Sequence, residues 1–340
     1  EEGEDGLPAR VSSIDDADAE RDRILAVLFS GVEPRIAAIQ TKTLTVGDAS
    51  VILFHIPRSH KAPHLITAKG LNQFWIRHDR QKSRMSIDEI RDVVIKTENI
   101  LQDLEGFLTR RRQEILNEVV VTPYYVISAI PLLRTGKDIL DIRDERLRSL
   151  LIDGPNQRYA SWSFHFEGYG CVRPSIHGLR AFAMNAEAWK SLHLFRNGYF
   201  EARILIDGSF CREKVRVEKS TKIPTGEVMV LYPYAVSEYL ASYFRILQEI
   251  KNHLGIEETY VVAVRLLNIK RYALKPYRPN AIGYQDNEVS VWDEEHLEIA
   301  PAEYDISKPG DEIANEISDR IWQAFGFERC PMFEAGVFKQ

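Results

Sequence analysis

The stretch SIDEIRDVVIKTENILQDLEGFLTRRRQEILNEVVVTPYYVISAIPLL, residues 86–133, decides the organisation of this chain. Ser86, followed three residues later by Glu89, forms a capping-box pattern, which predicts that a helix begins here. Apolar residues then recur at steps of three, four or seven as far as Ile115, so we expect a helix over residues 87–117. Gly106 lies inside this pattern, and glycine costs about 1 kcal/mol relative to alanine in a helix, so we expect a kink or a break there.

Beyond Glu118 the pattern becomes rich in β-forming residues, so the helix is predicted to connect two domains. Asn197-Gly198 between two β-rich runs predicts a hairpin turn, because both residue types tolerate a positive φ. Further expected elements are helices over 144–151, 235–253 and 311–325, strands over 228–232 and 260–267, and a buried strand face at Trp162, Phe164 and Phe166. These elements alternate without regular βαβ spacing, which favours an α+β fold with a mixed or antiparallel sheet over residues 118–340.

Residues that precede the long helix predict a smaller α+β domain. Asp15, Asp16 and Asp18 are placed to cap and begin a helix, and Ile24, Leu25, Leu28 and Phe29 would form its apolar stripe. Short β-rich runs follow at 36–40, 50–56 and 74–77. Phe74 and Trp75 are neighbours on the last of these strands, so at most one of the two is expected to be exposed.

The composition is that of a globular protein of two domains. The chain has 340 residues, of which 44% are hydrophobic and 28% charged, and its net charge is −6. It has no run of 18 apolar residues, so we expect no membrane span. The three cysteines, Cys171, Cys211 and Cys330, have no CxxC spacing, which favours a reducing, cytoplasmic location over a disulfide framework.

One region departs from the acidic character of the whole. Between Arg58 and Arg84 the chain holds seven Lys or Arg residues and a single acidic residue, Asp79. Cations on a loop and an adjacent strand, next to the flat surfaces of Phe74 and Trp75, match what a phosphate backbone rewards, namely point charges and a stacking surface. The alternative is a solvated loop whose charges only favour solubility. The residues predicted to contact nucleic acid are Arg58, Lys61, His64, Arg77, Arg80, Lys82 and Arg84.

Other charged clusters give weaker signals. His55, His60 and His64 have no acidic residue among them and lie beside Arg58 and Lys61, so we expect no metal site there. Arg110, Arg111 and Arg112 would point in different directions on a helix, which is typical of a solvated helix surface. The chain has no GxxxxGK[ST], GxGxxG or GxSxG motif, and it therefore gives no sign of a phosphate-cradling loop or a nucleophile elbow.

Three segments resemble a known family in their order and spacing. GVEPRI (31–36), HIPRSHKAPH (55–64) and FWIRHDRQKSRMSIDEIR (74–91) are similar to the C-terminal half of the Schlafen-type AlbA-like DNA-binding domain. Arg77 matches that family's recurrent arginine, and Ser59 with Pro63-His64 matches its loop. The resemblance covers residues 1–95, and the N-terminal half of the domain, with its glutamate-containing strand and glycine-rich turn, has no counterpart here.

The resemblance implies a truncated AlbA-like nucleic-acid-binding domain at 1–95, a connecting helix at 96–117, and an α+β domain of unknown role at 118–340. It further implies a cytoplasmic protein of bacterial type that binds DNA or RNA, needs no cofactor, and could form homo-oligomers. Residues 118–340 resemble no family.

Two alternatives stay open. The first is that the chain is part of a Schlafen-like, metal-dependent endoribonuclease, which would need a divalent metal and clustered carboxylates. The second is a non-catalytic sensor or interaction module, in which the aromatic residues Tyr159, Trp162, Phe164, Phe166 and Tyr169 would contact a protein partner.

Overall fold

A computed structural model describes residues 14–339 except 15, 37–38, 48, 79–80, 120, 134–137, 156–161, 167–169, 184–189, 207–212, 218–225, 258 and 275–289. The chain divides into two compact units, Glu1–Glu105 (unit 1) and Gly106–Gln340 (unit 2). The predicted α+β class is confirmed, because helices and mostly antiparallel sheets make up the described chain. None of the helices in the described residues is both long and apolar enough to cross a membrane.

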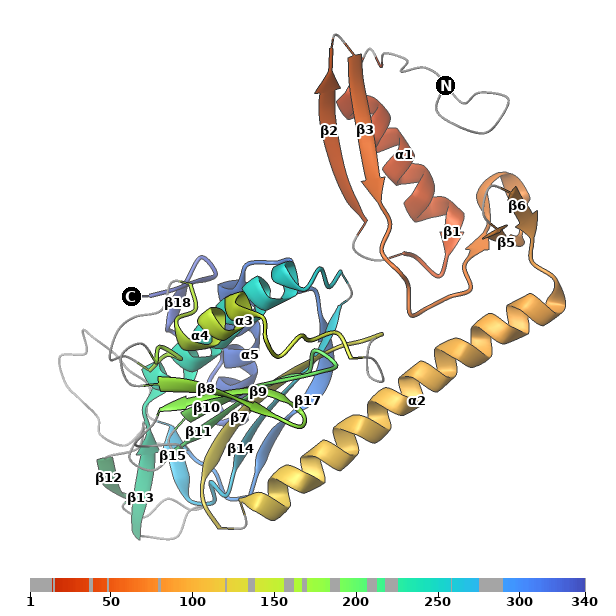
Figure 1. Ribbon diagram of the computed structural model, residues 1–340. Coiled ribbons are helices and arrows are strands. Elements are labelled where there is room, and N and C mark those ends of the chain that lie inside the picture. Colours follow the sequence, from red (N-terminus) through yellow and green to blue (C-terminus); the bar gives the residue numbers. More distant parts are fainter. Residues whose placement is uncertain are drawn as a thin grey trace. The chain divides into compact units, whose positions relative to one another are not determined.

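Helix α2 (Ile87–Glu118) spans the boundary between the two units (Figure 1). Its predicted capping box is confirmed, since the Ser86 amide donates to Glu89 Oε2 at 2.7 Å and the Glu89 amide donates to Ser86 Oγ at 3.2 Å. The break expected at Gly106 is not observed. The helix continues through this residue, where a Cβ would meet no atom within 4 Å.

Unit 1 consists of α1, a two-stranded sheet, a four-stranded sheet and the first part of α2. Its elements are α1 (Ala17–Gly31), β1 (Val32–Glu33), β2 (Gln40–Val46), β3 (Ala49–His55), β4 (Leu65–Ile66), η1 (Ala68–Gly70), β5 (Gln73–His78) and β6 (Gln81–Arg84). The four-stranded sheet has the order β1-β4-β5-β6, and β2 pairs with β3. The predicted caps are partly confirmed, because the Asp16 carboxylate accepts the Ala19 amide at 2.9 Å.

The described part of unit 1 buries very little apolar surface. Only Gly31 and Leu104 are buried among its described residues. The stripe predicted on α1 is not buried as expected, since Phe29 is 45% exposed. The two strands β2 and β3 pair over seven residues, and Leu53 of β3 is also exposed.

Unit 2 is built on an antiparallel sheet of seven strands in the order β17-β14-β7-β11-β10-β9-β8. The strands are β7 (Tyr124–Pro131), β8 (Gly170–Ser175), β9 (Gly178–Ala183), β10 (Lys190–Phe195), β11 (Phe200–Leu205), β14 (Tyr260–Leu267) and β17 (Leu297–Tyr304). A second sheet contains β12 (Glu213–Val217), β13 (Gly226–Leu231), β15 (Tyr272–Leu274) and β16 (Ser290–Val291), of which β13 and β15 are parallel. A short hairpin, β18 (Phe333–Glu334) and β19 (Val337–Phe338), lies near the C-terminus.

One face of the large sheet carries the main core (Figure 1). Helices α3 (Glu145–Ile152), α4 (Pro233–His253) and α5 (Gly310–Ala324) contribute buried residues to the same cluster as Ile127, Leu192 and Ala202 of the sheet. The positions predicted to be buried on α4 and α5 are confirmed: Tyr239, Leu240, Tyr243, Phe244, Leu247 and Ile250, and Ile313, Ile317, Ile321 and Phe325.

Of two local predictions in unit 2, one is confirmed and the other is wrong. The β10–β11 hairpin forms as expected, but of its two turn residues only Gly198 has a positive φ, +82°, and the amide of Phe195 pairs with the carbonyl of Tyr199. The strand expected at residues 162–166 is absent apart from one bridge between Asp153 and His165. Residues 163–166 are all buried in succession, so their burial does not follow the alternation of a strand.

Candidate functional site

The β5–β6 hairpin gathers three cations and an indole on one face. Antiparallel pairing places Trp75 opposite Arg84 and Arg77 opposite Lys82. Because directly opposite residues and residues two apart on a strand point to the same side, all four side chains share a face. All four residues are exposed, and Trp75 has 36% of its surface accessible.

The other face of the hairpin is anchored to the long helix. Phe74 and Ile76 are partly buried there, which confirms that only one of Phe74 and Trp75 is exposed. His78 Nε2 lies 3.1 Å from Glu89 Oε1, and the hydrogen bonds from Ser86, together with His78, hold the pKa of Glu89 below its ordinary value. The capping box therefore fixes the hairpin as well as the start of α2.

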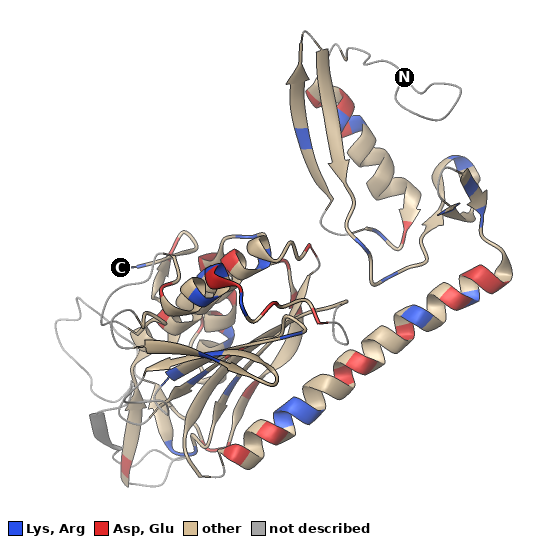
Figure 2. Cartoon of the chain, viewed as in Figure 1, with Lys and Arg blue, Asp and Glu red and all other residues tan. Residues whose placement is uncertain are grey.

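The loop between β3 and β4 carries a second group of cations. Arg58 and Lys61 are both exposed, and Thr97 of α2 donates to the carbonyl of Ala62 at 3.3 Å. Figure 2 shows blue segments both on this loop and on the hairpin. Within the described residues no acidic side chain forms an ion pair with Arg58, Lys61, Lys82 or Arg84.

His64, one of the residues predicted to bind nucleic acid, does not join this group. His64 Nδ1 donates to the carbonyl of Pro34 at 2.6 Å, and its Nε2 is buried with no partner among the described residues. That geometry gives His64 no exposed donor, so the phosphate-binding role predicted for it is not supported. Arg80 lies outside the described residues.

The second basic run is only partly a solvated helix surface: Arg110 is exposed as expected, but Arg111 and Arg112 are held by acidic residues. The Arg111 side chain is only 12% exposed and donates from Nε and Nη2 to the two carboxylate oxygens of Glu201, each at 2.8 Å. Arg112 pairs with Glu298 of β17, whose carboxylate also accepts from Arg265 at 3.1 Å. These arginines attach the end of α2 to the polar face of the seven-stranded sheet.

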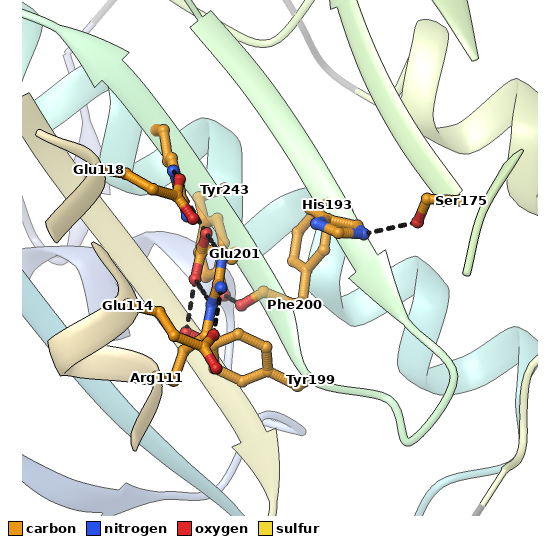
Figure 3. Close-up of polar contacts among 10 residues, drawn as sticks. Arg111, Glu114, Glu118, Ser175, His193, Tyr199, Phe200, Glu201 and Tyr243 are labelled. Atoms are coloured by element: carbon orange, nitrogen blue, oxygen red, sulfur yellow. Dashed lines mark hydrogen bonds and ion pairs between the residues drawn. The ribbon is translucent and has the colours of Figure 1, made fainter. Parts of the chain in front are cut away.

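Glu201 is the centre of a buried charge network on this face (Figure 3). It is 1% exposed, and beyond the two bonds from Arg111 it accepts from Arg203 Nε at 2.7 Å and from the Tyr199 hydroxyl at 2.8 Å. Burial alone would raise the pKa of Glu201, but Arg203 and Arg111 outweigh it and lower the pKa to about 2. The carboxylate is therefore ionised at neutral pH.

Beside this network, Ser175 and His193 lie within hydrogen-bond distance. Ser175 Oγ is 3.2 Å from His193 Nε2, but it also accepts the backbone amides of His177 and Gly178 in the β8–β9 turn. Burial, together with nearby arginines, lowers the pKa of His193 to about 4. The serine is thus fixed in a turn, and the pair does not have the arrangement of an activated nucleophile.

Sequence reasoning missed the whole network. The available signal was the alternation of Glu201 and Arg203 in the otherwise apolar strand FEARIL, which places two opposite charges on one face of a central strand. Aromatic residues that it did identify, Phe164 and Phe166, are fully buried and form no exposed platform. Tyr159 and Tyr169 lie outside the described residues.

Comparisons with known proteins identify no relative. No family model matches the chain. No curated protein and no solved structure matches it either.

Proposed function

We propose that unit 1 is a nucleic-acid-binding unit of the Schlafen-type AlbA-like kind, and that the exposed face of the β5–β6 hairpin contacts the phosphate backbone. The observation that carries the proposal is the register of the hairpin, which aligns Arg77, Lys82 and Arg84 beside Trp75. Cations that share one face offer several contacts to a phosphate backbone at once, so an anion can lie over Arg77 and Lys82 together.

Trp75 adds a second kind of contact. An exposed indole next to arginine and lysine can stack on an unpaired base, a contact of about 1–3 kcal/mol per base that does not depend on sequence. Arg58 and Lys61 of the preceding loop would extend the phosphate contacts beyond the hairpin. The proposal therefore favours single-stranded DNA or RNA, or duplex ends with unpaired bases, over continuous duplex.

A matched pair of charge reversals tests the proposal by fluorescence anisotropy with labelled single-stranded DNA. Arg84→Glu removes one phosphate contact, and we expect it to weaken binding to the single strand at least about fivefold at 0.1 M salt through counterion release. Lys42→Glu makes the same change of charge at an exposed position of β2, outside the hairpin, and should have little effect. If both variants weaken binding equally, only the net charge matters and the hairpin face is not the site.

The indole is tested separately. Trp75→Ala should weaken binding to single strands by about 1–3 kcal/mol, and duplex DNA of the same length should be affected less. If Trp75→Ala changes neither, the residue does not stack on bases.

Binding, and not cleavage, is proposed for these residues. Among the described residues, no group of three or more His, Cys, Asp or Glu side chains is placed to hold a metal ion. Incubation of the chain with RNA in Mn²⁺ or in EDTA separates the two activities. Retention of intact RNA under both conditions agrees with the proposal, and cleavage that depends on Mn²⁺ would replace it with the endoribonuclease alternative.

A further inference from the structure

A cavity of about 390 Å³ opens on the polar face of the seven-stranded sheet in unit 2. Its floor consists of three residues from adjacent strands: Arg180 of β9, Ser191 of β10 and Arg203 of β11. The rim comes from Glu118 at the end of α2, from Val119 and Thr122 of the segment that follows, and from Tyr124, the first residue of β7. The volume lies at the low end of the range for small-molecule sites.

The floor is polar and held in place. Ser191 is 5% exposed and is the register partner of Arg203, whose side chain is 15% exposed. Arg203 Nε donates to the buried carboxylate of Glu201, and the guanidinium of Arg180 lies 5.7 Å from the centre of the Phe182 ring. Two guanidinium groups and a hydroxyl therefore surround the same space in a fixed arrangement, which is the donor set that recognises carboxylates and phosphates.

The guanidinium group of Arg203 already pairs with a carboxylate at the rim of the cavity. Arg203 Nη1 donates to Glu118 Oε2, and the Glu118 side chain is 53% exposed. Because Glu118 is this exposed, breaking its ion pair with Arg203 costs little free energy. In contrast, Glu201 accepts four hydrogen bonds and cannot leave Arg203. The site therefore has one exchangeable anionic position and one permanent one.

We propose that this cavity binds a small organic anion, whose carboxylate or phosphate group pairs with Arg203 and Arg180 in the position that the Glu118 carboxylate now takes. Ser191 would donate to the same group, and Val119 and Tyr124 would contact the apolar part of the ligand. The inference concerns unit 2 alone and does not depend on nucleic-acid binding by unit 1.

Isothermal titration calorimetry of the full chain with inorganic phosphate, and separately with acetate, tests the proposal. We expect saturable one-to-one binding of at least one of them. Arg180→Gln should weaken it about tenfold, because it removes a charge-assisted donor. Glu118→Gln should strengthen binding about two- to fivefold, because the competing carboxylate is lost.

Arg173→Gln is the matched control. Arg173 is the register partner of Arg180 on β8 and is exposed, but it does not line the cavity, so its replacement should leave the affinity unchanged. Ser191→Ala serves as a second variant if Arg180→Gln fails to fold, and we expect it to weaken binding as well. Stronger binding of phosphate than of acetate identifies a phosphate ligand, and the reverse order a carboxylate.

Three results would overturn the inference: no saturable binding of either anion, equal affinity in Arg180→Gln and Arg173→Gln, or no gain in Glu118→Gln. Loss of anion binding in Arg84→Glu, which leaves unit 2 unchanged, would also overturn it by placing the anion on the hairpin of unit 1.

Discussion

Replacing Glu201 by glutamine is predicted to cost about 3–5 kcal/mol of the free energy of unfolding. Each oxygen of the buried Glu201 carboxylate accepts two hydrogen bonds, so its four acceptor sites are all used. A glutamine amide keeps one oxygen and presents an NH₂ group to the other two donors. At least one guanidinium N–H then faces another donor, and the charges of Arg111 and Arg203 lose their buried counter-ion.

Glu114→Gln is the matched control for this prediction. Glu114 accepts from Arg111 Nη1 at 2.7 Å, so the same substitution affects a partner of the same arginine. Its side chain is 48% exposed, however, and we expect a loss of less than about 1 kcal/mol. Urea denaturation followed by circular dichroism measures both free energies of unfolding. An unchanged slope of the unfolding free energy against urea concentration would show that the folded state is preserved. Equal effects of the two substitutions would refute the reasoning, because burial would then not decide the contribution.

The same carboxylate predicts a dependence of stability on pH. The pKa of Glu201 is lowered to about 2 in the folded chain from an ordinary value of 4.5, which corresponds to about 3 kcal/mol of stability. A depressed folded pKa means that this contribution is complete above pH 4.5 and is lost as the pH falls towards 2. Glu201→Gln lacks this titration, so the difference in unfolding free energy between the two proteins should shrink over that interval. A constant difference from pH 6 to pH 2.5 would contradict the assignment.

Two further predictions concern the backbone. Hydrogen exchange should be at least about a hundredfold faster at the amides of β3 than at those of β14, because β14 is buried along its whole length and β3 has no buried residue. Similar protection of the two strands would contradict this prediction. Gly178→Ala should destabilise the chain by at least about 2 kcal/mol, since φ is +154° and a Cβ would lie 2.0 Å from the carbonyl oxygen of Leu194. Gly106→Ala, in the open interior of α2, should instead stabilise the chain by about 0.5–1 kcal/mol. Thermal unfolding should therefore show a lower midpoint temperature for Gly178→Ala and a higher one for Gly106→Ala than for the unsubstituted chain.

Much of the fold follows from local patterns. The helical periodicity predicted α4 and α5 with their buried residues, and the capping box located the start of α2. These predictions succeed because the signal lies within a few residues of the element it defines. The apolar stripe of α1 gave the helix correctly but not its burial, since burial depends on what packs against the helix.

The buried charge network could not be predicted in the same way. Arg111 and Glu201 are 90 residues apart in the sequence, and Arg112 and Glu298 are 186 apart. Nothing local to the run Arg110–Arg112 distinguishes a solvated surface from a set of buried partners. The cationic hairpin is intermediate, because the sequence identified its residues and only the strand register placed Arg77, Lys82 and Arg84 on one face.

The salt dependence of nucleic-acid binding tests the proposed function most directly. Three cations on the hairpin face predict a slope of log K against log salt of about −2.1 on single-stranded DNA, and about −3.5 when Arg58 and Lys61 also contact phosphates. On this account Arg84→Glu should make the slope less steep by about 0.7, while Lys42→Glu leaves it unchanged. A flat titration of the unsubstituted chain would contradict the account, since the exposed cations of unit 1 would then make no contact with phosphate.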